Sequence, residues 1–158
     1  MISALREINR YLHFLTGGGS WRLLPHEEAI LDACLAALPQ GAQEPARRQL
    51  KEKFFLERMT DGRINVVRPY GDADANIINS AGFDDRLYRV KIKVDGEAVT
   101  AHVTFNKGRV FSIETKKQTK FFKGKSLEVL GVIEGRSSDT FTRVIDRSEH
   151  GRENEFDE

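Results

Sequence analysis

The spacing of apolar residues changes part way along the chain, and this change predicts where helices give way to strands. Up to about residue 54, apolar side chains recur every three or four positions, which is the repeat of an amphipathic helix. The pattern predicts helices over residues 3–15, from Pro25 to Leu38 and from Glu44 to about Lys53. After these segments apolar and polar residues alternate, as they do in strands that bury one face.

Two Asp-Gly pairs, Asp61-Gly62 and Asp95-Gly96, lie between strand-like runs and predict β-hairpins, and the second is expected to have a two-residue turn. For the second hairpin the register follows from the turn. It pairs Val94 with Glu97, Ile92 with Val99, Val90 with Ala101 and Tyr88 with Val103. All but the first of these pairs are apolar and share one face. A slip of one residue would mix apolar and polar side chains, so the register is well specified.

A third turn at Asn106-Lys107-Gly108 extends the hairpin into a three-stranded meander over residues 87–94, 98–105 and 109–117. A three-residue loop with glycine in its left-handed position pairs Val103 with Phe111 and Ala101 with Ile113. Residues 127–133 predict a further strand, with a short helix as the alternative. We expect the Asp61-Gly62 hairpin to join the same sheet.

Helices followed by strands predict an α+β fold, because a parallel sheet would need the two kinds of element to alternate. We expect about three N-terminal helices to pack on one face of an antiparallel meander of five or six strands. Residues 1–148 are predicted to form a single domain. The polar, acidic residues 149–158 are expected to form a frayed tail.

Composition narrows the class of protein. In this 158-residue chain a hydrophobic share of 39% is enough for a buried core. The single cysteine, Cys34, excludes an internal disulfide and lies on a helix face where it acts as a small hydrophobic residue. Charged residues interrupt the N-terminal apolar pattern, and no run approaches the roughly 20 apolar residues that span a bilayer. We therefore expect a cytoplasmic protein that does not bind membranes.

Several motifs that suggest chemistry are incomplete. The glycine run at residues 16–21, TGGGSW, lacks the preceding strand and the following Gly-Lys-Ser/Thr of a phosphate loop. The DADAN segment at residues 72–76 begins like a calcium loop but lacks its glycine and its final glutamate. A looser cation site there is the alternative to a solvated turn. No histidine has metal-ligand spacing with another histidine or with Cys34, so no metal and no cofactor is predicted.

One histidine is a weak catalytic candidate. The predicted register places His102 across from Arg89, with Glu114 diagonal to it. A histidine close to a carboxylate can exchange protons with a substrate. The same residues also fit the solvated face of an antiparallel sheet, which commonly buries only one side. The second interpretation is favoured, and the chain is interpreted as a non-enzymatic protein.

The most suggestive segment is TKKQTKFFKGK at residues 115–125, which has five lysines, two phenylalanines and no acidic residue. Clustered lysines attract phosphates, and exposed aromatic rings stack on unpaired bases. A net charge of only +1 argues against nucleic-acid binding. Two phenylalanines in a charged connection are also a common anchor to a core. The candidate binding residues are Lys91, Lys93, Lys116, Lys117, Lys120, Phe121, Phe122, Lys123 and Lys125.

Elimination therefore leaves three hypotheses. The first is a small protein-binding domain, such as an inhibitor or immunity-like protein, that meets an acidic protein partner through these lysines. The second is nucleic-acid binding through residues 107–125, which contain seven basic residues and one acidic residue. The third is a small enzyme centred on His102. The oligomeric state is not predicted, since the composition of an edge strand does not decide it.

Overall fold

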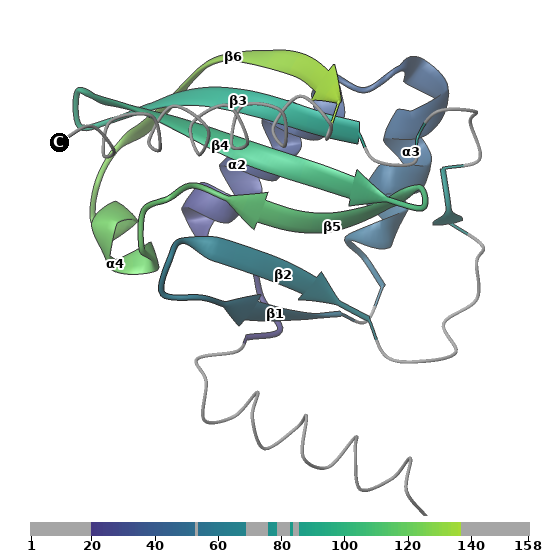
Figure 1. The fold of residues 1–158 in the computed structure, drawn as a ribbon, viewed down its shortest axis with the longest axis horizontal. Coiled ribbons are helices and arrows are strands. Elements are labelled where there is room, and N and C mark those ends of the chain that lie inside the picture. Colours follow the sequence, from purple (N-terminus) through teal and green to yellow (C-terminus); the bar gives the residue numbers. More distant parts are fainter. Residues whose placement is uncertain (1–19, 53, 69–75, 79–82, 84–85, 137–158) are drawn as a thin grey trace, which may run out of the picture.

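The computed structural model describes residues 20–52, 54–68, 76–78, 83 and 86–136, and these form an α+β fold (Figure 1). Two helices, α2 (Pro25–Ala36) and α3 (Gln40–Gln49), precede a six-stranded antiparallel sheet. The strands are β1 (Phe55–Arg58), β2 (Arg63–Val67), β3 (Arg86–Val94), β4 (Glu97–Asn106), β5 (Arg109–Glu114) and β6 (Leu127–Arg136). They lie in the order β1-β2-β5-β4-β3-β6. The predicted fold class is confirmed.

The hairpin register predicted from the second Asp-Gly pair is confirmed at all four pairs, from Val94 with Glu97 to Tyr88 with Val103. Both Asp95 and Gly96 have positive φ, as a tight turn of this type requires. The Asp61-Gly62 hairpin joins the same sheet, because β2 pairs with β5. Residues 127–133 belong to strand β6, so the short-helix alternative is excluded.

The predicted register between β4 and β5 is wrong. Asn106 pairs with Arg109, so the turn has two residues, Lys107 and Gly108, rather than the predicted three. The register also shifts between Thr104 and Phe105, and Val103 therefore pairs with Ile113 rather than Phe111. Phe111 is the extra residue of this irregularity, and its side chain is 47% exposed. A bulge of this kind inserts one residue and thereby reverses the face of the residues beyond it. The strand also ends at Glu114 rather than at residue 117, because Lys116 turns the chain with φ of 55°.

Helix α3 begins four residues before the predicted Glu44 and ends at Gln49, four residues before Lys53. Its buried residues are Ala42, Ala46 and Gln49, which lie four and three positions apart on one face. The helix tolerates Pro45, whose missing N–H removes one main-chain hydrogen bond. Leu50 and Phe54, which follow Ala46 at four-residue spacing, pack in the core beyond the end of the helix.

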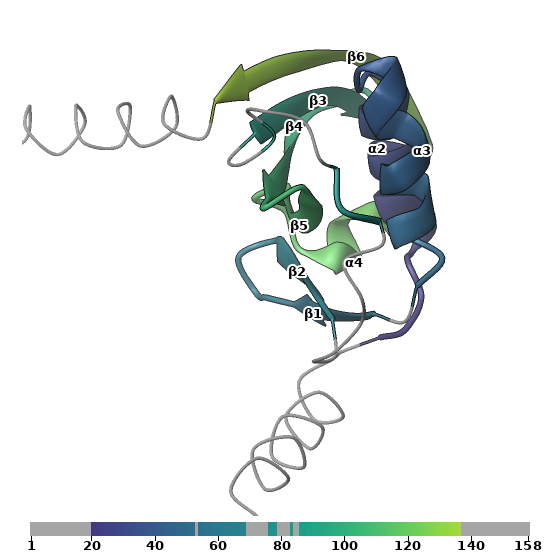
Figure 2. The same ribbon diagram turned by 90° about the vertical axis from the view of Figure 1, so that its right-hand side faces the viewer.

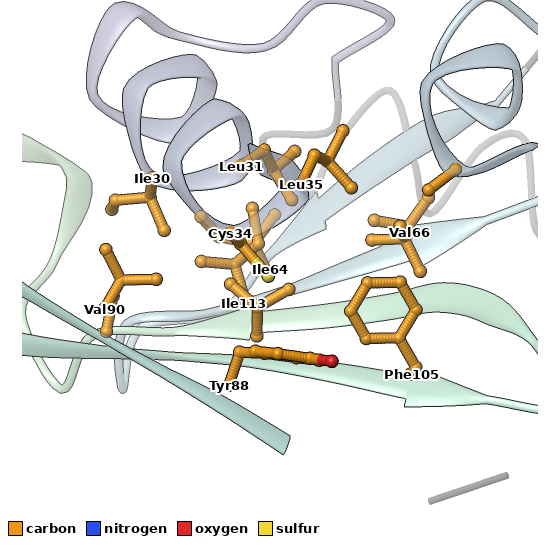
Figure 3. Close-up of a cluster of buried hydrophobic side chains, with 14 of the residues drawn as sticks. Ile30, Leu31, Cys34, Leu35, Ile64, Val66, Tyr88, Val90, Phe105 and Ile113 are labelled. Atoms are coloured by element: carbon orange, nitrogen blue, oxygen red, sulfur yellow. The ribbon is translucent and has the colours of Figure 1, made fainter. Parts of the chain in front are cut away.

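The sheet curls around the two helices, so its helix-covered face is concave and its outer face is convex (Figure 2). Contacts at both edges agree with this shape: α2 packs against β6, and a side chain of α2 bonds to β1. The core fills the space between the layers (Figure 3). Its central members, all buried, include Ile30, Leu31, Cys34 and Leu35 from α2 and Tyr88, Val90, Phe105 and Ile113 from the sheet.

A buried ion pair joins α2 to the edge strand β1. The side chain of Glu27 is fully buried, and it accepts hydrogen bonds from Arg58 Nε at 2.6 Å and Arg58 Nη2 at 2.7 Å. Glu27 also accepts one from the backbone N–H of Leu24 at 2.8 Å, which caps the start of the helix. Arg58 Nη2 reaches the carbonyl of Arg22 at 3.0 Å as well. The carboxylate is thus paired and hydrogen-bonded, as a buried charge must be.

Gln49, the last residue of α3, is fully buried and connects this helix to the turn between β4 and β5. Its amide Nε2 donates to the carbonyls of Asn76 at 2.7 Å and Gly108 at 2.8 Å. Its Oε1 accepts from the N–H of Val110 at 2.9 Å. The buried amide of Gln49 therefore has hydrogen-bond partners for both its nitrogen and its oxygen, as a buried polar side chain requires.

Four sequence-based predictions lie outside the described residues. They are the first helix over residues 3–15, the glycines of the 16–21 run, residues 72–75 of the DADAN segment with the alternative cation site at Asp72, Asp74, Asp84 and Asp85, and the polar tail over residues 149–158.

Candidate functional site

The lysine-rich connection from β5 to β6, residues 115–126, is held at both ends by hydrogen bonds; we call it the lysine platform. At its start the N–H of Thr115 donates to the carbonyl of Gly62 at 3.1 Å, and the buried Thr115 hydroxyl donates to the carbonyl of Lys117 at 2.8 Å. At its end the N–H and hydroxyl of Ser126 both donate to Asp95 Oδ1 at 2.9 Å. These hydrogen bonds from Ser126 hold the pKa of the Asp95 carboxyl below its ordinary value.

The turn between β1 and β2 lies directly against the platform. Gly62 has φ of +88°, and a Cβ added there would stand 2.6 Å from both the N and O atoms of Lys117. Only glycine allows this backbone conformation and this approach together. The first Asp-Gly pair therefore forms a hairpin turn and also leaves room for the platform.

The middle of the platform is anchored by an aromatic side chain. Residues Thr119–Phe122 form the short helix α4, from which Phe122 points into the core with 6% of its surface exposed. The ring of His26 in α2 stacks on Phe122, with centroids 4.2 Å apart and planes at 3°. Burial lowers the pKa of His26, an effect that the nearby Glu27 carboxylate partly opposes. The neutral imidazole is therefore the form that suits this stack.

Phe121 is half-buried, and the ammonium groups of two lysines contact its ring. The ammonium of Lys125 lies 3.7 Å from its ring centroid and that of Lys117 lies 4.8 Å from it. Lys117 also forms an ion pair with Glu97 at 2.7 Å, which lowers the pKa of that carboxyl. Cation–π contacts of this kind fix the two ammonium groups over the ring. A nucleic-acid base that stacked on Phe121 would compete with them.

The remaining lysines of the platform, Lys116, Lys120 and Lys123, are exposed. Among the described residues none of the three has a carboxylate within 4.0 Å. Lys91 and Lys93 are exposed on the outer face of β3, two positions apart, and Lys93 precedes the turn that Ser126 binds. The structure therefore brings five exposed lysines to one end of the sheet and its adjoining outer face, where Glu128 of β6 is aligned with Lys93.

The structure places His102, Arg89 and Glu114 in one row across the outer face. His102 pairs with Arg89 on β3 and with Glu114 on β5, so Glu114 lies directly opposite rather than diagonal because of the shorter turn and the bulge. The Glu114 carboxylate lies 3.7 Å from Arg63, and among the described residues no hydrogen bond joins it to His102. Burial lowers the pKa of His102, and Glu114 partly opposes this shift. The outer face of the sheet is convex (Figure 2), and all three residues of the row are half-buried.

Other chemistry finds little support in the described part of the chain. Cys34 is buried in the core, and this burial raises the pKa of its thiol to about 12. A thiol in this state is a poor nucleophile. Within the described ranges no group of three or more histidine, cysteine, aspartate or glutamate side chains is arranged to hold a metal ion. None of the described helices has the length and apolar character to cross a bilayer.

Sequence reasoning found the lysines but missed the residues that hold them. The anchors outside the platform are His26, Gly62 and Asp95, which come from three separate parts of the chain. The two Asp-Gly pairs indicated turns, but no local signal indicated that both turns would contact residues 115–126. Comparisons with protein-family models, with curated proteins and with solved structures found no significant match to this chain.

Proposed function

We propose that this chain is a non-enzymatic protein-binding domain, such as an inhibitor or an immunity-like protein, whose lysine platform binds an acidic surface on another protein. The observation that carries the proposal is the threefold anchoring of the platform at Thr115, Phe122 and Ser126. A segment already held in one conformation loses little entropy when it binds. Flexible lysines on an unanchored loop would lack this advantage.

The charge arrangement supports an acidic partner. Lys116, Lys120 and Lys123 project from the platform, and Lys91 and Lys93 continue the positive surface along β3. Like charges gathered at one place steer an oppositely charged partner and exclude basic ones. Because these side chains are exposed, the attraction should weaken as salt screens it.

Nucleic-acid binding uses the same lysines and is the alternative. Phosphates would be attracted equally well, but sequence-tolerant binding of single strands also needs aromatic rings on which bases stack. Phe122 is buried against His26, and Phe121 is covered by the ammonium groups of Lys117 and Lys125. This arrangement favours a protein partner over a single-stranded nucleic acid.

The test is affinity capture with the full chain from cells that express it natively. The double variant Lys120→Glu/Lys123→Glu reverses two exposed charges of the platform and should lose the partner. Lys51→Glu, at the end of α3 and away from the platform, makes the same type of change and should retain it. Capture of no specific protein, or equal capture by both variants, would contradict the proposal.

Nuclease treatment distinguishes nucleic-acid binding from protein binding. If capture disappears after nuclease treatment, or if a single-stranded oligonucleotide binds with a steep salt dependence while an oligoglutamate peptide of equal charge does not, nucleic acid is the ligand. If capture survives nuclease and oligoglutamate competes for it, the protein proposal stands.

A further inference from the structure

The two edges of the sheet differ in how their main-chain groups are covered. Strand β1 has four residues, and the preceding chain covers it where Ser20 and Leu56 exchange hydrogen bonds of 3.1 and 2.8 Å. Strand β6 has ten residues and pairs with β3 along almost its whole length. In the part of the chain that the structure describes, no strand pairs with its other edge. An edge of this length is a template for another strand.

Exposed apolar side chains gather on the same strand. Of the six large hydrophobic residues exposed among those described, three are in β6: Val129 at 39%, Leu130 at 53% and Ile133 at 46%. Val129 is aligned with the core residue Ile92, so it lies on the helix-covered side, whereas Ile133 is aligned with Arg89 on the outer side. Leu130 is the extra residue of a bulge. A strand paired with this edge would place side chains beside both faces of β6 and would cover these apolar residues. Their exposure on both faces therefore fits an edge whose partner strand comes from another molecule.

The charges along β6 indicate which strand would fit. Lys123 and Lys125 precede its start and Glu128 follows the start, while Arg136 and Glu134, which pairs with Arg86, lie at its end. Two copies of β6 related by a two-fold axis run antiparallel, so the start of each lies beside the end of the other. This arrangement brings Lys125 of one copy towards Glu134 of the second, and it does so twice. A parallel arrangement would instead set the lysines against each other.

We propose that β6 pairs with β6 of a second copy of this chain, which forms a two-fold dimer through a continuous sheet. Pairing of one edge buries less than the roughly 1,200–2,000 Å² of a standard stable interface. The bulge at Leu130 also interrupts the ladder. The dimer is therefore concentration-dependent rather than obligate, and the folded monomer exists in equilibrium with it.

The test measures the molar mass of the full chain by sedimentation equilibrium over a wide range of concentration. The mass should rise from monomer towards dimer with concentration. Leu130→Glu and Ile133→Glu should each shift this rise to at least tenfold higher concentration, because each buries a charge in the interface. Phe111→Glu is the matched control: this residue is 47% exposed but lies on β5, and the variant should dimerise like the natural chain. Circular dichroism checks that each variant is folded.

Hydrogen exchange on the natural chain keeps the proposal testable even if a variant fails to fold. Amides in residues 127–136 should exchange more slowly as concentration rises, while those of β4 should not change. A monomer at all concentrations up to about 1 mM overturns the proposal. Dimerisation that survives both β6 substitutions also overturns it. So does concentration-independent exchange of the β6 amides that point away from β3, because these are the groups that a second β6 would bind.

Discussion

Replacement of Arg58 by methionine should destabilise the protein far more than the loss of an ordinary surface charge. Arg58 is 11% exposed and donates two hydrogen bonds, at 2.6 and 2.7 Å, to the fully buried carboxylate of Glu27. Its removal leaves that carboxylate with the N–H of Leu24 as its remaining close donor among these contacts. Breaking a buried ion pair from one side costs about 3–5 kcal/mol. This is a large part of the roughly 5–15 kcal/mol that stabilises a typical domain.

The free energy of unfolding can be measured by urea titration, with circular dichroism and the fluorescence of the single tryptophan, Trp21, as probes. In a chain of this length each kcal/mol shifts the melting temperature by roughly 2–4 °C, so we expect a fall of about 6–20 °C. The matched control is Arg48→Met, which removes an exposed partner of Glu44 and should cost no more than about 0.5 kcal/mol.

A double variant distinguishes the cost of leaving one buried charge unpaired from the cost of changing the side chains. Glu27→Met/Arg58→Met removes both charges and should be more stable than Arg58→Met alone, because no buried charge is left unpaired. It still loses the helix cap on Leu24, for which we expect about 1 kcal/mol. A loss below about 1 kcal/mol for Arg58→Met, or a double variant less stable than the single one, would refute the reasoning.

Three further predictions concern backbone strain and titration. Gly62→Ala should lower the free energy of unfolding, measured by urea titration, more than Gly96→Ala does. Both glycines have positive φ, which costs an alanine about 1–2 kcal/mol, but only Gly62 would also bring its Cβ against neighbouring backbone. Equal losses in the two variants would contradict this. Because the pKa of His26 is lowered, the neutral His26 side chain contributes to the stability of the fold above pH 6.5. This contribution is lost as the pH falls below that value. The melting temperature of the natural chain should therefore fall more between about pH 7 and pH 5 than that of His26→Phe, and equal slopes would disprove the role of this residue. Cys34, whose pKa is raised to about 12, should react with a thiol reagent at pH 8 far more slowly in the native than in the unfolded chain; similar rates would show that the thiol is accessible.

Much of the sheet was predictable because alternation and turn chemistry agree where β3 meets β4. The Asp95-Gly96 turn fixes the loop length, and apolar residues then fall on one face in both strands. The same logic failed at β5, where Phe111 is apolar yet lies outside the core. A bulge inserts a residue without a change in composition, so an alternating pattern cannot show it.

The contacts between distant segments were not predictable from one sequence. Glu27 lies in the first turn of its helix, where acidic residues are common, and nothing nearby indicates that Arg58 would neutralise it. Gln49 has the character of a surface residue, and nothing near it in the sequence indicates that the turn at Gly108 packs against it. The lysines of the candidate site were identified from composition, whereas their anchors depend on which loops the fold brings together.

Two of the residues that give the lysine platform its charge are distinct from those that shape it. Thr115, Phe122 and Ser126 hold the chain and Lys116 turns it, while Lys120 and Lys123 are exposed to solvent. Substitutions at exposed positions of this kind usually change stability by less than about 0.5 kcal/mol. The sign and density of charge at this end of the molecule can therefore change in evolution, or in the laboratory, without a change in the scaffold that displays it.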